Sequence, residues 1–94
     1  MKLDKDDLSK MDDSRSFVPH HDRDGIIAYI ETGRPLGGFL NAVFCNDLMA
    51  AYGRADSENQ AAMQTIVTWI YNFAPSDCHG SPERVNYYSE RFKN

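Results

Sequence analysis

The apolar residues of this chain are concentrated in the stretch 37–53, GGFLNAVFCNDLMAAYG. Read as a helix, the stretch carries apolar groups on nearly every face, with polar interruptions only at Asn41, Asn46 and Asp47. A surface helix keeps one apolar stripe, whereas a helix that is apolar on several sides must be covered by other helices or by another subunit. The pattern therefore predicts a central helix over 37–53, with the other elements packed around it.

Two further helices are predicted, one before this stretch and one after it. The first begins near Asp22, with Asp22 or Asp24 as its N-cap, and ends at Gly33, which suits a left-handed C-cap. The other follows an N-cap at Asp56 and stops before Pro75. Its apolar residues recur at spacings of three, four and seven, as on one face of a helix. They are Ala62, Met63, Ile66, Val67, Ile70 and Phe73.

A C-terminal helix is predicted from the run 81–83, Ser-Pro-Glu, which supplies a hydroxyl N-cap, a proline at the first helical position and an acid in the first turn. Val85, Tyr88 and Phe92 give this helix a thin apolar seam. The expected fold is therefore all-α, a compact bundle of three main helices plus a C-terminal helix. Residues 20–94 are expected to form a single domain.

Residues 1–19 are rich in charge and carry few large apolar groups. Such a segment buries too little apolar surface to offset the entropy that it loses on ordering. We therefore expect a flexible charged tail. A second interpretation stays open, in which Leu8, Met11 and Phe17 dock on a partner and the tail folds as it binds.

The chain has 94 residues and a formal net charge of −4. The acidic balance argues against direct nucleic-acid binding, because sequence-independent binding needs a surplus of lysine and arginine. No apolar run of about 18 residues and no signal segment occurs, so we expect neither a membrane span nor secretion. Cys45 and Cys78 are expected to be reduced thiols in a cytosolic protein.

Self-association is expected from the size of the core. A domain this small buries little apolar surface, and oligomerisation is a common way to stabilise it. The predicted central helix also has more apolar surface than three short neighbours can cover. We therefore expect a homo-oligomer with an interface around Phe39, Val43, Phe44 and Tyr52.

Histidine, cysteine and aspartate, the donors that zinc prefers, gather at 20–24 and 78–79. Structural zinc sites usually space their ligands two to four residues apart, because side chains of adjacent residues point in different directions. We therefore expect no metal site. His20 and His21 are expected to be solvated just before the first helix, and the sequence leaves the role of His79 open.

Anion binding is a second possibility. Glycines at a helix N-terminus leave backbone amides open to a phosphate, and a nearby arginine can add a bidentate contact. The structural alternative is a tight turn, and it is favoured because an isolated glycine pair is not a phosphate-loop motif. The nucleotide-binding set under this hypothesis is Arg34, Gly37, Gly38, His21 and Arg23.

Four polar residues near the turn between the second and third predicted helices form a third candidate: Asn46, Asp47, Asp56 and Asn59. If buried, they would have to find hydrogen-bond partners in one another, which predicts a structural network fixing this turn. The alternative is an acid/base pair made by Asp47 and Asp56. No nucleophile accompanies that pair, and hydrolase, P-loop, EF-hand and zinc-finger patterns are absent. We therefore expect no enzyme and no cofactor.

Two runs of the chain, 37–60 and 66–85, resemble a group of small proteins encoded by tailed bacteriophages and prophages. The similarity covers roughly residues 25–88. It is carried by Gly38-Phe39-Leu40, Asn46-Asp47-Leu48, Ala55-Asp56 with Asn59, and Pro75 followed by Gly80-Ser81-Pro82. This chain departs from the pattern at His79, where tryptophan is frequent. The resemblance implies a phage protein acting in the host cytoplasm, and it carries over no catalytic residue.

Small accessory phage proteins often act by stoichiometric binding. We therefore expect a non-catalytic protein that binds a host protein in counter-defence or host takeover, through an acidic and aromatic surface. The alternative is a sponge that sequesters a nucleotide second messenger of host immunity, using the Arg34 set. A metal-binding protein or enzyme ranks third.

Overall fold

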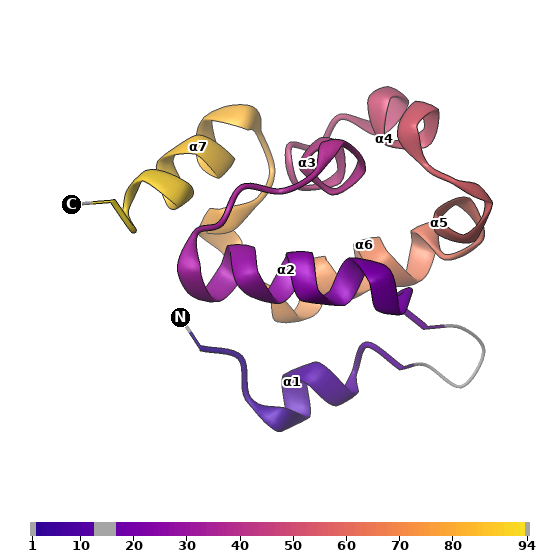
Figure 1. Ribbon diagram of the computed structural model, residues 1–94, viewed down its shortest axis with the longest axis horizontal. Coiled ribbons are helices and arrows are strands. Elements are labelled where there is room, and N and C mark those ends of the chain that lie inside the picture. The colour runs from indigo at the N-terminus through magenta and orange to yellow at the C-terminus, as the bar shows by residue number, and fades with distance from the viewer. Residues whose placement is uncertain (1, 13–16, 94) are drawn as a thin grey trace.

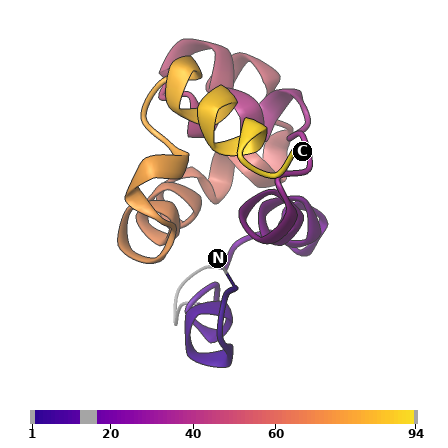
Figure 2. The ribbon, with the colours of Figure 1, turned by 90° about the vertical axis from the view of Figure 1, so that its left-hand side faces the viewer.

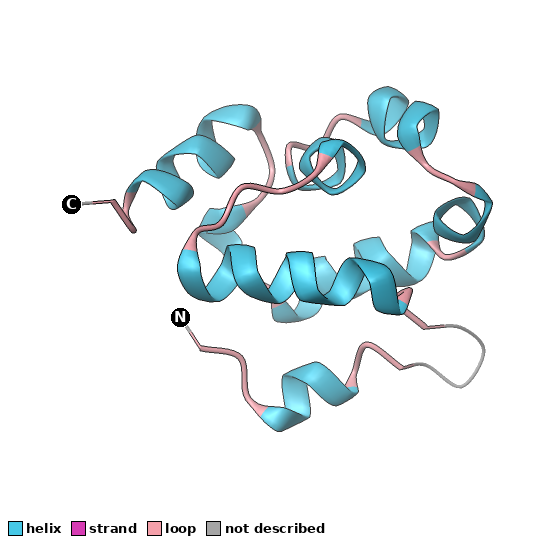
Figure 3. Ribbon diagram, viewed as in Figure 1, coloured by secondary structure: helices cyan, strands magenta, loops and turns pink. Residues whose placement is uncertain are grey.

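The computed structural model describes residues 2–12 and 17–93, and every regular element in these ranges is a helix (Figures 1 and 3). The predicted all-α fold is confirmed. No helix in the described ranges is long and apolar enough to cross a membrane. The elements are α1 (Lys5–Ser9), α2 (His20–Thr32), α3 (Gly38–Phe44), α4 (Leu48–Arg54), α5 (Ser57–Ala61), α6 (Met63–Phe73), the 3-10 turn η1 (Ser76–Cys78) and α7 (Pro82–Glu90).

The core lies where α2 and α6 meet, and other elements close it on two sides. Figures 1 and 2 show α1 on one side of α2, and α3 and α7 on the other. Tyr29 of α2 donates a hydrogen bond to the carbonyl of Cys78 and packs edge-on against Phe44 of α3. The largest buried side chains are Trp69, Tyr29, Phe44, Met11, Ile26, Ile30 and Ile66. Their burial supplies most of the hydrophobic stabilisation.

The stretch 37–53 is two helices, and the prediction of one central helix is wrong. The chain turns between α3 and α4 at Asn46, whose φ of 62° lies in the left-handed region that asparagine tolerates better than most residues. Asp47 then accepts a hydrogen bond from the backbone N–H of Ala50 at 3.2 Å and caps α4. Both side chains offer the backbone local alternatives to helix, and this outweighs the apolar pattern.

The boundaries of α2 are partly as expected. Gly33 ends the helix with φ 76°, and a Cβ at this position would lie 2.5 Å from the Phe92 ring, so glycine is required there. The helix starts at His20, after Pro19, and no side chain caps it. The expected cap at Asp22 or Asp24 is therefore wrong, because both residues lie within the helix rather than before it.

The helix expected from Ser57 covers the right residues but is interrupted. Asp56 caps α5 by accepting a hydrogen bond from the N–H of Asn59 at 2.8 Å, as predicted. Ala62 leaves the helical conformation, and α6 continues to Phe73, just before Pro75. Ser81 caps α7 as predicted.

The N-terminal segment packs on the domain where the structure describes it, which differs from the expected unpacked tail. Leu3, Met11 and Val18 are buried in the same core cluster as α2 and α6. The indole N–H of Trp69 donates to the carbonyl of Asp7 at 2.9 Å. A few well-placed apolar groups therefore dock the segment despite its charge. Its flexibility stays a prediction, and for residues 1 and 13–16 it falls outside the described ranges.

Candidate functional site

An apolar hollow lies between α4 and α6, and we call it the α4–α6 groove. Leu48 and Tyr52 stand one turn apart on α4, and Val67 and Tyr71 stand one turn apart on α6, so each helix presents one stripe. The cavity volume is about 310 Å³, at the lower end of the range for binding pockets. Its lining is Val43, Asn46, Asp47, Leu48, Ala51, Met63, Val67, Ile70, Tyr71, His79 and Gly80.

Large apolar side chains on α4 and α6 are strongly exposed. Met49 is 85% exposed, Tyr71 79% and Leu48 63%, and Tyr52 and Val67 are each nearly half exposed. Single exposed apolar residues are normal, but a group of them beside an apolar hollow marks an interaction surface. The α6 sequence MQTIVTWIYNF contains no charged residue, and α4 carries a charge only at its last residue. The groove is therefore suited to an apolar partner.

His79 contributes a polar group to the groove. Its Nε2 is buried and has no hydrogen-bond partner within residues 2–12 and 17–93. Burial lowers the pKa of His79, and Arg84 lowers it further, so the imidazole is neutral near pH 7. A bound group that hydrogen-bonds to Nε2 would satisfy this orphaned atom. The sequence left His79 without a role because its neighbours come from α3, α4 and α6.

The expected oligomer interface needs correction. Phe44 is fully buried inside a single chain and cannot contact a second copy in this conformation. Phe39 and Val43 are only partly exposed because they pack against the core, and Tyr52, which is nearly half exposed, is the most accessible of the four predicted residues. The turn between α3 and α4 directs apolar side chains of α3 into the core. The exposed large apolar side chains of the stretch 37–53 are therefore those of α4.

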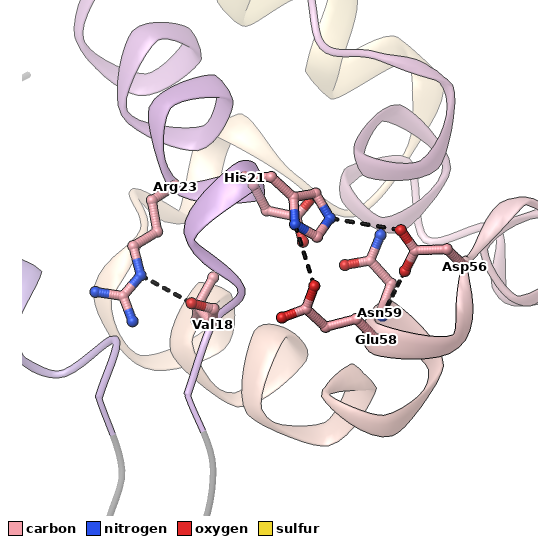
Figure 4. A network of polar contacts seen from close by, with 7 residues as sticks. Val18, His21, Arg23, Asp56, Glu58 and Asn59 are labelled. Atoms are coloured by element: carbon pink, nitrogen blue, oxygen red, sulfur yellow. Dashed lines mark hydrogen bonds and ion pairs between the residues drawn. The ribbon is translucent and has the colours of Figure 1, made fainter.

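A second cluster joins the start of α2 to α5 (Figure 4). His21 is its centre, with Nε2 3.6 Å from Asp22 Oδ1 and 3.6 Å from Asp56 Oδ2, and with Nδ1 3.4 Å from Glu58 Oε1. Asn59 lies beside these groups. Asp22 and Asn59 are each 5% exposed, and Asp22 Oδ2 and Asn59 Oδ1 find no hydrogen-bond partner in the part of the chain that the structure describes. We call this set the carboxylate cluster.

The carboxylate cluster holds more negative than positive charge. Burial raises the pKa of Asp22, the Asp56 and Glu58 carboxylates raise it further, and His21 opposes them. The nearby Arg23 does not compensate, because its guanidinium donates to the carbonyl of Val18 (Figure 4). It also donates to the Asp12 carboxylate.

We predict that Asp22→Asn stabilises the protein at pH 7. When the pKa of an acid is raised in the folded state, its protonated form stabilises the fold relative to its ionised form. This stabilisation is complete below the ordinary pKa of 3.8, and it is lost as the pH rises through the raised value. The isosteric amide removes the buried charge, with a gain of roughly 1 kcal/mol, or about 4–8 °C in Tm. Thermal melts followed by circular dichroism at pH 7 and pH 3.5 measure the difference from wild type, which should shrink in acid. Asp24→Asn, an exposed change on the same helix, is the control, and a Tm below wild type at pH 7 would contradict the prediction.

The predicted nucleotide-binding residues do not form one site. His21 and Arg23 lie in the first turns of α2, whereas Arg34 follows the end of this 13-residue helix, about 20 Å away along its axis. Arg23 is already paired, and the carboxylates around His21 would repel a phosphate. Gly37 and Gly38 are exposed at the start of α3. The grouping expected from the sequence is therefore wrong.

The four predicted network residues serve separate roles. Asp47 caps α4, Asp56 caps α5, and the exposed Asn46 forms the left-handed turn. Only Asp56 and Asn59 are joined by a hydrogen bond within the described residues, through the backbone N–H of Asn59. The expected single network is therefore wrong, and Asn59 belongs to the carboxylate cluster instead.

Metal binding and thiol chemistry are two other possibilities for the described side chains. In residues 2–12 and 17–93, no group of three or more His, Cys, Asp or Glu side chains is disposed to hold a metal ion. Cys45 and Cys78 are free thiols. Burial raises the pKa of Cys78 to about 12 and also raises that of Cys45. Because the thiolate is the nucleophilic form, both cysteines are poorly suited to attack a substrate at neutral pH.

Comparison of the chain with protein-family models, with curated proteins and with solved structures found no significant match. The resemblance to tailed-phage proteins therefore stays a prediction. The α4–α6 groove and the carboxylate cluster are the two candidate binding sites.

Proposed function

We propose that this protein is a non-catalytic binding protein whose α4–α6 groove holds a helix of a host protein in a stoichiometric complex. The observation that supports the proposal is the exposed apolar surface of α4 and α6 around a cavity of about 310 Å³. Following the resemblance to phage proteins, we place its action in counter-defence or host takeover in the host cytoplasm.

The dimensions of the groove suit a short amphipathic helix. Its floor runs along α6 from Met63 to Ile70, eight residues or about 12 Å, which is two helical turns. Helix-in-groove recognition uses apolar side chains at i, i+3 or i+4, and i+7 of the bound helix. Asp47 is the only charged residue among the described residues that line the groove, so an acidic residue on the inserted stripe would lose its solvation without gaining a partner.

The experiment is capture of a host protein, followed by quantitative binding with the purified partner. Val67→Glu places a charge in the groove at a half-exposed helical position that tolerates glutamate. We expect it to weaken binding at least tenfold in isothermal titration calorimetry, with one partner per protein chain in the wild-type complex. The matched control is Tyr87→Glu, which alters an aromatic that is 70% exposed on α7. Unchanged affinity for the Val67→Glu protein would sink the proposal.

A second copy of the chain is the competing occupant of the groove, and it is the form that the expected homo-oligomer would take. Native mass spectrometry of the protein alone distinguishes the two. A wild-type dimer that Val67→Glu converts to a monomer, with host-protein binding unchanged, would assign the groove to self-association and overturn the host-helix proposal. Turnover of a host substrate by substoichiometric protein would overturn the non-catalytic assignment.

A further inference from the structure

We propose that the carboxylate cluster is a binding site for a cationic nitrogen group, a guanidinium or an alkylammonium. This site goes beyond the proposed function, because it lies on α2 and α5 and does not use the α4–α6 groove. The groups that would contact the cation are Asp22, Asp56, Glu58 and Asn59, with His21 as the side chain that now stands among them.

The carboxylate cluster carries an excess of negative charge. Three carboxylates surround one imidazole, so even a protonated His21 leaves the cluster negative. The neighbouring arginine points away from it, as Figure 4 shows. Carboxylates gathered near one another without a counter-charge repel, and a cation bound among them relieves this repulsion.

Two buried oxygens of the cluster have no hydrogen-bond partner among the described residues. Asp56 Oδ1 accepts from the Asn59 N–H and so has a structural role as a helix cap, while its Oδ2 faces His21. Helix capping does not account for the burial of Asp22 Oδ2 and Asn59 Oδ1, which are both acceptors. Figure 4 shows the Asn59 amide extending between the Asp56 and Glu58 carboxylates toward the His21 ring. A buried acceptor without a donor is costly, so a donor-rich ligand is the natural complement.

The spacing of the oxygens in the cluster favours a nitrogen cation over a metal ion. The carboxylate oxygens of the cluster are spread around the His21 ring. In the described residues, no three ligating side chains are disposed around a single metal ion. A guanidinium has five N–H donors in a fixed plane, and an ammonium has three, so either can reach several separated oxygens at once. Charge-assisted hydrogen bonds of this kind are the strong ones.

His21 gives the ligand a route to the buried oxygens. Its side chain is 48% exposed, and no hydrogen bond to another described residue holds it. The ring can therefore turn toward solvent when a competing cation enters. Binding would replace three loose contacts of 3.4–3.6 Å by direct hydrogen bonds to the ligand.

The experiment is titration of the folded protein followed by two-dimensional 1H–15N NMR. The probes are agmatine, a capped Gly-Arg-Gly peptide and cadaverine, at constant ionic strength. We expect saturable shifts of the Asn59 side-chain amide and of the His21 backbone amide, with millimolar Kd. A tighter Kd for the peptide assigns the site to an arginine of a partner protein, and a tighter Kd for agmatine or cadaverine assigns it to a free polyamine.

The variants separate a binding role from a structural one. Asp56→Asn removes a charge but keeps a good N-cap residue, so the fold is preserved. We expect Asp22→Asn and Asp56→Asn each to raise Kd at least fivefold, although Asp22→Asn stabilises the free protein, a combination that a purely structural role would not give. Glu83→Gln on α7 is the charge-matched control and should leave Kd unchanged.

Three outcomes would overturn the proposal. These are shifts that NaCl reproduces at the same concentration, tighter binding of CaCl₂ or MgCl₂ than of agmatine, and an unchanged Kd in both aspartate variants. The Val67→Glu protein should keep the agmatine shifts, so failure of the groove proposal and failure of this one are distinguishable.

Discussion

Replacing Trp69 with alanine is expected to lower the free energy of unfolding by about 3–5 kcal/mol, which is the usual cost of deleting a buried tryptophan side chain. Trp69 is 2% exposed, and its ring packs beside Phe73 with ring centroids 6.1 Å apart. The total free energy of unfolding of a domain of this size is roughly 5–15 kcal/mol. Thermal and urea unfolding followed by circular dichroism should therefore show a Tm at least about 12 °C lower, or a protein that is largely unfolded.

The Trp69→Phe protein loses the hydrogen bond and keeps part of the packing. Phenylalanine keeps an aromatic ring in the core but cannot donate to the Asp7 carbonyl. We expect a smaller loss, about 1 kcal/mol from the hydrogen bond, together with faster amide hydrogen exchange in residues 8–12. If exchange there is already fast in the wild-type protein and does not change, the N-terminal segment is a mobile tail, as its composition predicted, and its docking in the structure is wrong.

The N-terminal segment shows why composition alone misjudged its packing. Charge density predicts disorder when it is averaged over 1–19. Packing depends instead on where the few apolar groups fall, and Leu3, Met11 and Val18 all reach the same core. The backbone also helps, because the N–H of Val18 donates to the carbonyl of Met11 at 2.8 Å. This backbone pairing has no local sequence signal.

Helix ends were predictable where a single residue has one physical role. Gly33 supplies positive φ, Asp56 and Ser81 supply caps, and Pro75 cannot continue a helix. The apolar pattern does not predict the break at 45–47, where the local chemistry of two adjacent polar residues decides the structure. Asn-Asp inside an apolar run is a turn signal as much as a buried polar pair.

Both candidate surfaces depend on contacts between helices that are separate in the sequence. The α4–α6 groove exists because the turn at Asn46 brings Leu48 beside Val67, which is 19 positions later in the sequence. The carboxylate cluster exists because α2 and α5 meet at their first turns. Sequence reasoning singled out His21, Asp56 and Asn59, but it assigned them to different sites. Residue types were predictable, and their grouping required the fold.

Because of the turn between α3 and α4, two aromatic residues of the stretch 37–53 lie in different environments, and we expect their replacement to have different effects. Phe44→Ala should destabilise the protein by about 3–5 kcal/mol, because the ring is fully buried and meets Tyr29 edge-on with centroids 5.1 Å apart. Tyr52→Ala should change stability by less than about 0.5 kcal/mol, because that side chain is nearly half exposed. Urea unfolding of both variants measures the difference.

The concentration dependence of unfolding then decides between a core and an interface. If Phe44 stabilises the single chain, the loss in the alanine variant is independent of protein concentration. A wild-type Tm that rises with concentration, and a Phe44→Ala protein that loses this dependence while keeping its monomer stability, would restore Phe44 to an intermolecular interface. That outcome would also require α3 to turn outward and expose Tyr29, so a loss of the buried Tyr29–Cys78 hydrogen bond would accompany it.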